Sequence, residues 1–269
     1  MSYRHIKKLE QHLHLGVLGI ELHRPESRNA FSLTMITELV ELLQRAELDD
    51  GVRVLYLQGA GDSFCAGGDL KEMAQKAGMF AGEPNELRVR YQRGIQQIPL
   101  AIAALSKPLI GKINGPAIGA GCDLAAMCDI RMGTTKSKFG ETFCKLALVP
   151  GDGGTWFLPR VVGYAKALEM FLTGDIYNAQ QAYEMGLLNH VVQKEDLDKD
   201  TLALCLKIAG NSPIALSLTK KALQQSQKND LPAHLDLLAA YQGITQRTQD
   251  HFEGLDALRT GRPPQFSGF

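Results

Sequence analysis

Two glycine-rich segments and a few carboxylates are the residues of this 269-residue chain that are suited to chemistry. The first segment is GDSFCAGGDLKEM at residues 61–73, and the second is NGPAIGAGCDLAAMCD at residues 114–129. Each follows a short apolar stretch and leads into a helical one, as at a junction between a strand and a helix. Small residues there let a substrate oxygen approach the free N–H groups of a helix N-terminus. Two such junctions together predict an oxyanion hole made of backbone amides.

Other sites that glycine-rich segments build fit less well. Neither segment contains GxxxxGK[ST], and the second lacks the third glycine of GxGxxG. Tight turns would explain either junction alone, but they explain less well why two similar junctions follow successive strands. The chain has no GxSxG nucleophile motif and no HExxH metal motif, and none of its seven histidines lies in either segment. We therefore expect no metal site.

The elements that must position these junctions alternate between strands and helices up to about residue 163. We expect a strand or hairpin at 12–22, a helix capped by Ser32, a strand at 52–57, a helix near 87–104, and strands at 108–113 and from 130. Beyond residue 163 we expect helices at 164–174, 179–186, 197–210, 213–227 and 231–250, with one strand at 189–192. This order predicts an α/β core with a largely parallel sheet, and ligands bind at the carboxyl ends of such strands.

The composition narrows the class of protein. Apolar residues make up 45% and charged residues 22%, as in a soluble globular protein. The 29 basic and 29 acidic residues give a formal charge of zero, which argues against a general binder of nucleic acid or of anionic membranes. The five cysteines contain no CxxC pair, which favours reduced thiols. The polar N-terminus has no signal-peptide pattern and no stretch is long and apolar enough to span a membrane, so we expect a cytoplasmic protein.

An ordered set of segments resembles the crotonase (enoyl-CoA hydratase/isomerase) superfamily. Within it, the resemblance is greatest to the enoyl-CoA isomerases of phenylacetate degradation. Besides the two junctions, the segments are RNAF at 28–31, LVPGDGGTWFLPRVVG at 148–163, LTGDIYNAQQAYEMGLLNHVV at 172–192 and GRPPQFSGF at 261–269. The resemblance covers essentially the whole chain. It implies the crotonase (ClpP-like) fold, with repeated ββα units in a spiral core over residues 1–195 and a helical trimerisation or cover region over 196–269. It also implies a homotrimer, or a hexamer made of two trimers.

The resemblance implies a site for an acyl-CoA thioester, which is the substrate, so no separate cofactor is expected. The amides of Gly68 and Ala120 would hold the enolate oxygen; alanine replaces the glycine that is commonest at the second position. The residues expected along the CoA path are Arg28, Ala30, Cys65, Ala66, Gly68, Asp69, Leu70, Lys71, Gly119, Phe143 and Gly151, with Arg262 as a weaker candidate for a phosphate. Lys71 is equally explained as a solvated helix residue. Asp69 is better explained as a structural residue than as a catalytic one, because an aspartate near a helix start suits the helix dipole.

Three positions determine which acid–base chemistry the resemblance implies. Asp123 stands where the hydratases have their first glutamate, and Phe143 stands at the second, so the two-carboxylate hydration machinery looks incomplete. Glu141 is two residues away and, on a helix, would lie off that face. Asp152, in the turn PGDGGTW, lies one residue beyond the aspartate of the ring-oxepin isomerases. A turn aspartate that caps its own backbone explains Asp152 equally well.

Three functions remain open from the sequence. The first is an enoyl-CoA isomerase, in which one carboxylate, Asp123 or Asp152, removes and returns a proton. The second is a 2-enoyl-CoA hydratase with an altered acid pair, Asp123 with Asp152 or Glu141. The third is a noncatalytic acyl-CoA binder, against which the retention of Asp123 and Asp152 argues. The phenylalanine at position 143 favours the isomerase.

Overall fold

A six-stranded sheet forms the centre of the computed structural model, which describes residues 3–269. Its order is β1-β2-β3-β4-β6-β9, and only β1 is antiparallel to its neighbour. The strands are β1 (Ile6–Leu9), β2 (Val17–Leu22), β3 (Val54–Gly59), β4 (Leu109–Ile113), β6 (Ile130–Thr134) and β9 (His190–Val192). A smaller sheet joins β5 (Pro116–Ile118), β7 (Lys138–Gly140) and β8 (Ile176–Asn178). The predicted α/β core with a largely parallel sheet is confirmed.

Both faces of the large sheet are covered, as expected where parallel strands are linked by helices. Along β3, Leu55 and Leu57 belong to the main hydrophobic core, whereas Val54 and Tyr56 belong to a smaller one. This alternation follows from the two-residue period of a strand. The apolar run VLYL is therefore buried on both sides, and the strand ends at the first glycine-rich junction.

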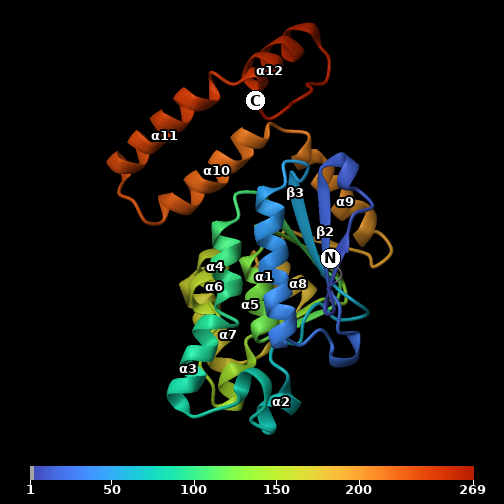
Figure 1. Cartoon of the computed structure of the whole chain (residues 1–269), viewed down its shortest axis with the longest axis vertical. Coiled ribbons are helices and arrows are strands. Elements are labelled where there is room, and N and C mark those ends of the chain that lie inside the picture. The colour runs from blue at the N-terminus through green and yellow to red at the C-terminus, as the bar shows by residue number, and fades with distance from the viewer. Residues whose placement is uncertain (1–2) are drawn as a thin grey trace.

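Helices α1 to α8 pack around the main core (Figure 1). Loops connect several of them to the carboxyl ends of the strands that precede them. Their bounds are α1 (Leu33–Leu48), α2 (Leu70–Ala74), α3 (Pro84–Arg93), α4 (Gln97–Ala104), α5 (Ala120–Met127), α6 (Gly154–Val162), α7 (Tyr164–Thr173) and α8 (Ala179–Glu184). As predicted, Ser32 caps α1, because its Oγ accepts a hydrogen bond of 3.1 Å from the N–H of Met35. The two junctions run into α2 and α5.

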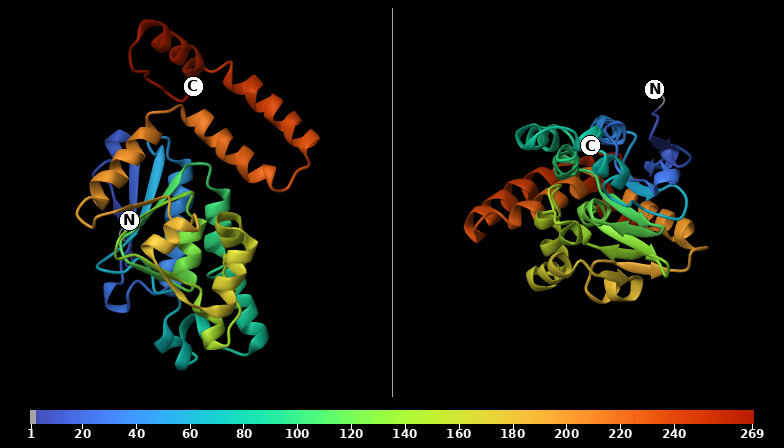
Figure 2. Two further views of the ribbon diagram at one scale, coloured as in Figure 1. Left: turned by 180° about the vertical axis from the view of Figure 1, so that it is seen from behind. Right: turned by 90° about the horizontal axis from the view of Figure 1, so that it is seen from below.

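The C-terminal helices fall into two groups. Helix α9 (Leu197–Ala209) packs on the sheet through Cys205 and Ala209, which belong to the smaller core. Helices α10 (Pro213–Ser226), α11 (Leu231–Thr245) and α12 (Gln249–Thr260) form an arm that projects from one end of the body (Figures 1 and 2). Arg53 connects the two parts, because its guanidinium donates to the carbonyl oxygens of Ala209 at 3.2 Å and Phe266 at 2.7 Å. The domain division at residue 195 stays a prediction, and residues 1 and 2 of its first region lie outside the described residues.

Several element predictions need correction. In the stretch 12–22 only Val17–Leu22 is a strand; Leu13–Leu15 form a 3-10 helix that ends at Gly16, whose φ is +78°. The helix predicted for 231–250 is interrupted at Gln246–Thr248, where the Thr248 side chain caps α12. The strands β1, β5, β7 and β8 were missed, because their three or four residues carry too little of the period-two pattern. The single helix predicted near 87–104 is two helices, α3 and α4.

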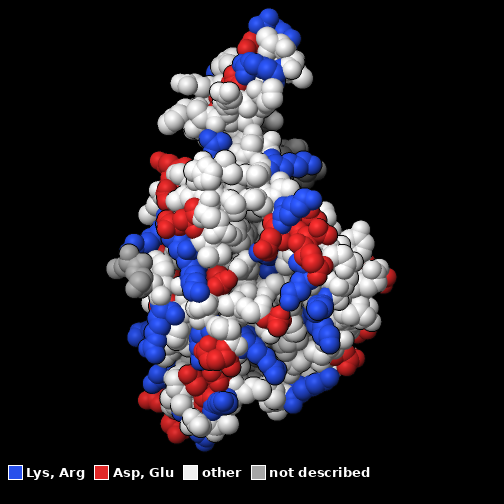
Figure 3. All heavy atoms as spheres, turned by 90° about the vertical axis from the view of Figure 1, so that its right-hand side faces the viewer, with Lys and Arg blue, Asp and Glu red and all other residues white. Residues whose placement is uncertain are grey.

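The surface agrees with the balanced composition. On the face drawn in Figure 3, acidic and basic side chains are interspersed over the body. Among residues 3–269, no single helix is long and apolar enough to cross a membrane; α9 and α10 meet that test only when taken together, and they are bent by 100°.

Candidate active site

Gly68, Ala120 and Asp152 line one cavity of about 230 Å³. They come from three segments: Gly68 precedes α2, Ala120 opens α5, and Asp152 lies in the loop before α6. The other lining residues, mostly apolar, are Ala66, Leu70, Met73, Met79, Phe80, Tyr91, Ile95, Ile118, Gly119, Thr142, Phe143, Lys145, Leu146 and Leu148. A larger groove of about 780 Å³ between α10 and the body contains none of the predicted catalytic residues. The smaller cavity is therefore the candidate active site.

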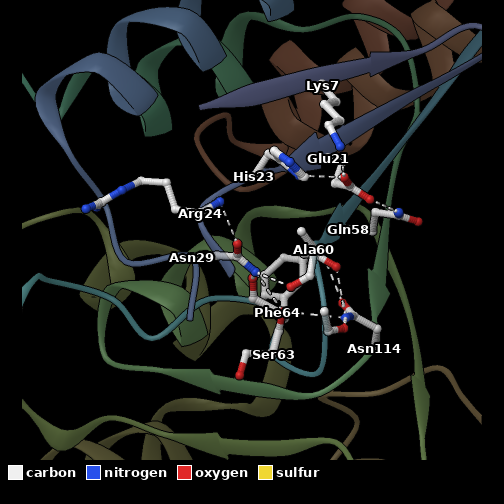
Figure 4. A network of polar contacts seen from close by, with 12 residues as sticks. Lys7, Glu21, His23, Arg24, Asn29, Gln58, Ala60, Ser63, Phe64 and Asn114 are labelled. Atoms are coloured by element: carbon white, nitrogen blue, oxygen red, sulfur yellow. Dashed lines mark hydrogen bonds and ion pairs between the residues drawn. The ribbon is translucent and has the colours of Figure 1, made fainter. Parts of the chain in front are cut away.

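Two asparagine side chains hold the loop that follows β3. Asn29, fully buried, donates through Nδ2 to the carbonyl oxygens of Ala60 and Ser63, both at 2.9 Å. Asn114 donates to the carbonyl of Gly59 at 2.9 Å and accepts from the N–H of Gly59 at 3.1 Å. Figure 4 shows both amides pointing into the loop from opposite sides. The backbone that leads to the first junction is thus fixed by side chains from two other segments.

The two glycine-rich junctions contact each other backbone to backbone. A Cβ atom on Gly67 would lie 2.6 Å from the carbonyl oxygen of Ile118, and one on Gly121 would lie 2.0 Å from the carbonyl oxygen of Cys65. Gly67 also has a φ of +82°, which disfavours any side chain. The N–H of Ile118 donates to the carbonyl of Cys65 at 2.9 Å. The close approach that brings Gly68 and Ala120 to one cavity therefore requires these glycines.

The amides of Gly68 and Ala120 are available to a ligand. Within residues 3–269, neither N–H group has a hydrogen-bond acceptor. Ala120 is the first residue of α5, so its N–H has no partner inside the helix. Two free amides on the wall of one cavity are the arrangement that an oxyanion hole requires. Their assignment to that role stays a prediction.

Asp123 and Asp152, the two predicted acids, lie side by side but only one reaches the cavity. Asp123 is fully buried in α5 and does not line the cavity, whereas Asp152 does. The Asp123 side chain faces the start of α6, where a Cβ atom on Gly154 would lie 1.5 Å from its Oδ1. Gly154 therefore makes the space that Asp123 occupies.

Glu141 joins this pair; the sequence offered it only as an alternative acid partner of Asp123 and expected it to lie off that face. It precedes the 3-10 helix at Thr142–Leu146, is fully buried and adjoins Asp123. The expectation that it lies off-face on a helix is wrong, because Glu141 directly follows β7 and is not helical. Strand β7 pairs with β5 in the register Ile118↔Gly140, which sets Glu141 beside α5. Nothing local in the sequence indicates that pairing.

Burial raises the pKa of each of the three carboxyl groups. The pKa of Asp123 is well above its ordinary value because of burial first, and then because of the charges of Glu141 and Asp152. Burial raises the pKa of Glu141 to about 8. Burial also raises the pKa of Asp152. Titratable groups with perturbed pKa values beside a cavity are typical of catalytic sites.

The loop that carries Asp152 is supported by the segment around α3 and α4. Gln96 Nε2 donates to the carbonyl oxygen of Gly151 at 2.7 Å. The ring of Tyr91 lies against Gly151, since a Cβ atom there would be 3.0 Å from Tyr91 Cε1. Gly153 follows with a φ of +113° and precedes α6. The turn therefore has a defined conformation that directs Asp152 inward.

A family model described as enoyl-CoA hydratase/isomerase matches residues 13–268. The chain belongs to the enoyl-CoA hydratase/isomerase family. It is 38% identical to the 1,2-epoxyphenylacetyl-CoA isomerase of Escherichia coli (strain K12), over 96% of this chain and 97% of that protein. It is 37% identical to the 2,3-dehydroadipyl-CoA hydratase of the same organism, over 94% and 95% of the two chains. Among solved structures, an enoyl-CoA hydratase from Bacillus anthracis superposes with a TM-score of 0.92 at 34% identity, covering 99% of this chain and 100% of that one.

Within this member of the enoyl-CoA hydratase/isomerase family, some predicted CoA-path residues line the cavity and others do not. Ala66, Gly68, Leu70, Gly119 and Phe143 line it, whereas Arg28, Ala30, Cys65, Asp69, Lys71 and Gly151 do not.

The charged candidates outside the cavity have different surroundings. Asp69 caps α2 by accepting from the N–H of Lys71 at 3.1 Å, and Lys71 itself is exposed. Arg28 is exposed, with a left-handed φ of +53°. Arg262 already pairs with Glu253 at 2.6 Å, which weakens its candidacy for a phosphate.

Proposed function

We propose that this protein is an enoyl-CoA isomerase in which Asp152 is the acid–base residue and the amides of Gly68 and Ala120 bind the thioester oxygen. One observation carries the proposal: in the described chain, Asp152 is the only carboxyl group on the wall of the cavity that contains both amides. One carboxylate on one face of the acyl group is sufficient for a double-bond shift. The acyl-CoA thioester is the substrate, and the proposal needs no resident cofactor.

The proposed reaction moves one proton. The Asp152 carboxylate takes a proton from C2 of a 3-enoyl-CoA, and the C–H electron pair enters a dienolate whose negative oxygen lies between the two amides. The protonated Asp152 then returns the proton to C4, which leaves the double bond between C2 and C3. The two amide donors bind the oxygen more strongly once negative charge develops on it, and this difference raises the rate.

Hydration of a 2-enoyl-CoA is the second candidate, because a relative 37% identical to this chain is named 2,3-dehydroadipyl-CoA hydratase. Hydration in the family relies on two carboxylates that hold and deliver a water. Here Phe143 presents an apolar ring to the cavity, and Asp123 lies behind Asp152 rather than on the cavity wall. Both features favour the isomerase.

The test supplies the purified protein with matched 3-enoyl-CoA and 2-enoyl-CoA substrates of short chain length. We expect the 3-enoyl-CoA to be isomerised, deuterium from D₂O to enter the acyl chain, and hydration to be slower. Asp152→Asn should lower turnover by about 10²–10⁴-fold with little change in melting temperature. Fast hydration without isomerisation would overturn the proposal in favour of the hydratase. Binding of acyl-CoA without any turnover would favour the noncatalytic binder.

We also propose a trimer, or a hexamer of two trimers, and a cytoplasmic location. The family resemblance supports the assembly, as do the apolar residues that the arm leaves exposed, among them Leu231, Leu235, Phe252 and Leu258. The location is supported by the five cysteines, whose lack of a CxxC pair favours reduced thiols.

A further inference from the structure

The carboxyl groups of Asp123, Glu141 and Asp152 form a buried cluster that lacks donors. Their exposed fractions are 0%, 0% and 4%. Both oxygens of Asp123, both of Glu141 and Oδ1 of Asp152 are buried without a hydrogen-bond partner among the described residues. Asp250 is a contrast, because this equally buried carboxylate accepts from the N–H groups of Ser267 at 2.7 Å and Gly268 at 3.1 Å.

The side chains around the cluster bring no positive charge to it. The titratable neighbours are the Cys122 thiol beside Glu141, and Cys65 and Tyr91 towards Asp152. None of the lysines and arginines of the described chain forms an ion pair with any of the three carboxyl groups. Three ionised carboxylates at this position would therefore be buried, mutually repelling and unpaired, which is strongly unfavourable.

Protonation of some of the carboxyl groups removes both the repulsion between them and the lack of hydrogen-bond donors. An ionised carboxylate only accepts hydrogen bonds, whereas a protonated one also donates. The charges of Glu141 and Asp152 both act on Asp123, whose side chain faces the start of α6, two residues after Asp152. Asp152 is the member that lines the cavity, and it comes two residues before α6, whose N-terminus favours a negative charge. A negative charge is therefore best placed on Asp152, with protons on the two groups behind it.

We propose that Asp123, Glu141 and Asp152 act as one proton-sharing unit, in which Glu141 donates to Asp123, Asp123 donates to Asp152, and Asp152 meets the acyl group as a carboxylate. Asp123 and Glu141 are then positioning residues, and Asp152 is the catalytic residue. The inference rests on the proposed function for the role of Asp152. It adds that the residue at the family's first glutamate position works through Asp152 and not on the substrate.

Matched variants distinguish the loss of a hydrogen-bond donor from the loss of a carboxyl group. Asn at position 123 and Gln at position 141 keep an N–H donor and resemble the protonated acids, whereas Asp123→Ala and Glu141→Met remove it. We expect Asp123→Asn to lose less than about tenfold in kcat/KM, and Asp123→Ala to lose at least tenfold more. In Asp123→Ala the acid limb of the pH–rate profile should move up by about one unit, because the Asp152 carboxylate loses a donor.

Infrared spectroscopy of the full chain at neutral pH provides a readout that does not depend on turnover. The wild-type protein should show the C=O band of buried protonated carboxylic acids. Asp123→Asn and Glu141→Gln should each weaken that band, whereas Asp152→Asn and the control Asp250→Asn should leave it. Circular dichroism establishes that each variant is folded.

Several outcomes would overturn the inference. No acid band in the wild type, or loss of the band in Asp152→Asn alone, would contradict the assigned protons. An Asp123→Asn variant as inactive as Asp152→Asn, with isomerisation by the wild type intact, would show that Asp123 acts on the substrate. A wild-type protein with no isomerase activity would instead defeat the proposed function, and the infrared test would still decide the proton-sharing unit.

Discussion

At the scale of single residues, Glu141 and Asp250 show that burial alone does not define the state of a carboxyl group. Asp250 Oδ1 accepts from the N–H of Ser267 at 2.7 Å, so this buried side chain has a backbone donor. Glu141 has no such donor within the described residues, and burial raises its pKa to about 8. Glu141 should therefore stabilise the fold when it is protonated.

This difference predicts how stability depends on pH. Because the folded-state pKa of Glu141 lies above its ordinary 4.5, the folded chain binds the extra proton between pH 4.5 and about 8. Its contribution is complete below pH 4.5 and is lost as the pH rises through 8. In thermal melts, Glu141→Gln should make the decline between pH 5 and pH 8 shallower by roughly 5 °C.

Asp250→Asn is the control for those melts, and it should lower the midpoint at both pH values because it disturbs accepted hydrogen bonds. Parallel curves for the wild type and Glu141→Gln would contradict the prediction.

The sequence anticipated part of the site at this scale. Gly68, Ala120 and Asp152 could be singled out because each lies in a local motif, and the structure places all three at one cavity. Glu141 was named only as an alternative acid, and its contact with Asp123 could not be found in that way, because the pairing of β5 with β7 brings the two together. Such non-local pairing leaves no periodic signal in one sequence.

At the scale of elements, the site depends on two junctions that pack through glycine. The surroundings of Gly67 and Gly121 leave no room for a Cβ atom. At each position, an added Cβ atom would clash with a carbonyl oxygen of the opposite junction. Strand and helix patterns predicted both junctions, because their apolar runs are long. The short strands β1, β5, β7 and β8 and the breaks between α3 and α4 and between α11 and α12 were not predicted, since elements and breaks of three or four residues lie below what periodicity detects.

Substitution at these glycines should separate the two backbones. Gly121→Ala would place its Cβ 2.0 Å from the carbonyl oxygen of Cys65, so the junctions must move apart. We expect a loss of about 2–4 kcal/mol in stability and a fall in kcat that exceeds any rise in KM. Urea unfolding and steady-state kinetics measure the two effects.

Gly243→Ala is the matched control for that substitution. It is also a helix glycine, nothing lies within 4 Å of its added Cβ, and it should be neutral or slightly stabilising. Equal effects at the two positions would argue against backbone packing as the cause.

At the scale of the whole molecule, the arm formed by α10, α11 and α12 departs from the body (Figure 2). Arg53 ties its terminal segment to the core, while apolar side chains on the helices remain exposed. Exposed apolar surface of this kind is typical of an interaction site.

If the arm joins protomers, assembly should respond to charge placed on it. Light scattering coupled to gel filtration should give three or six copies for the wild type. Leu258→Glu, at a side chain 82% exposed on α12, should reduce the assembly. Leu48→Glu, at a side chain 84% exposed at the end of α1, should not. A wild-type monomer, or equal behaviour of the two variants, would contradict the proposed trimer.

The buried carboxyl groups also change the electrical character of the protein. The formal charge of zero counts all 29 acidic side chains as ionised. If Asp123 and Glu141 keep their protons, 29 basic side chains stand against 27 anionic ones. The net charge of the folded chain near pH 7 is then about two units more positive than that of the unfolded chain. Native isoelectric focusing should then place the folded protein above the isoelectric point of about 7.0 that the sequence gives, and focusing in urea should return it there.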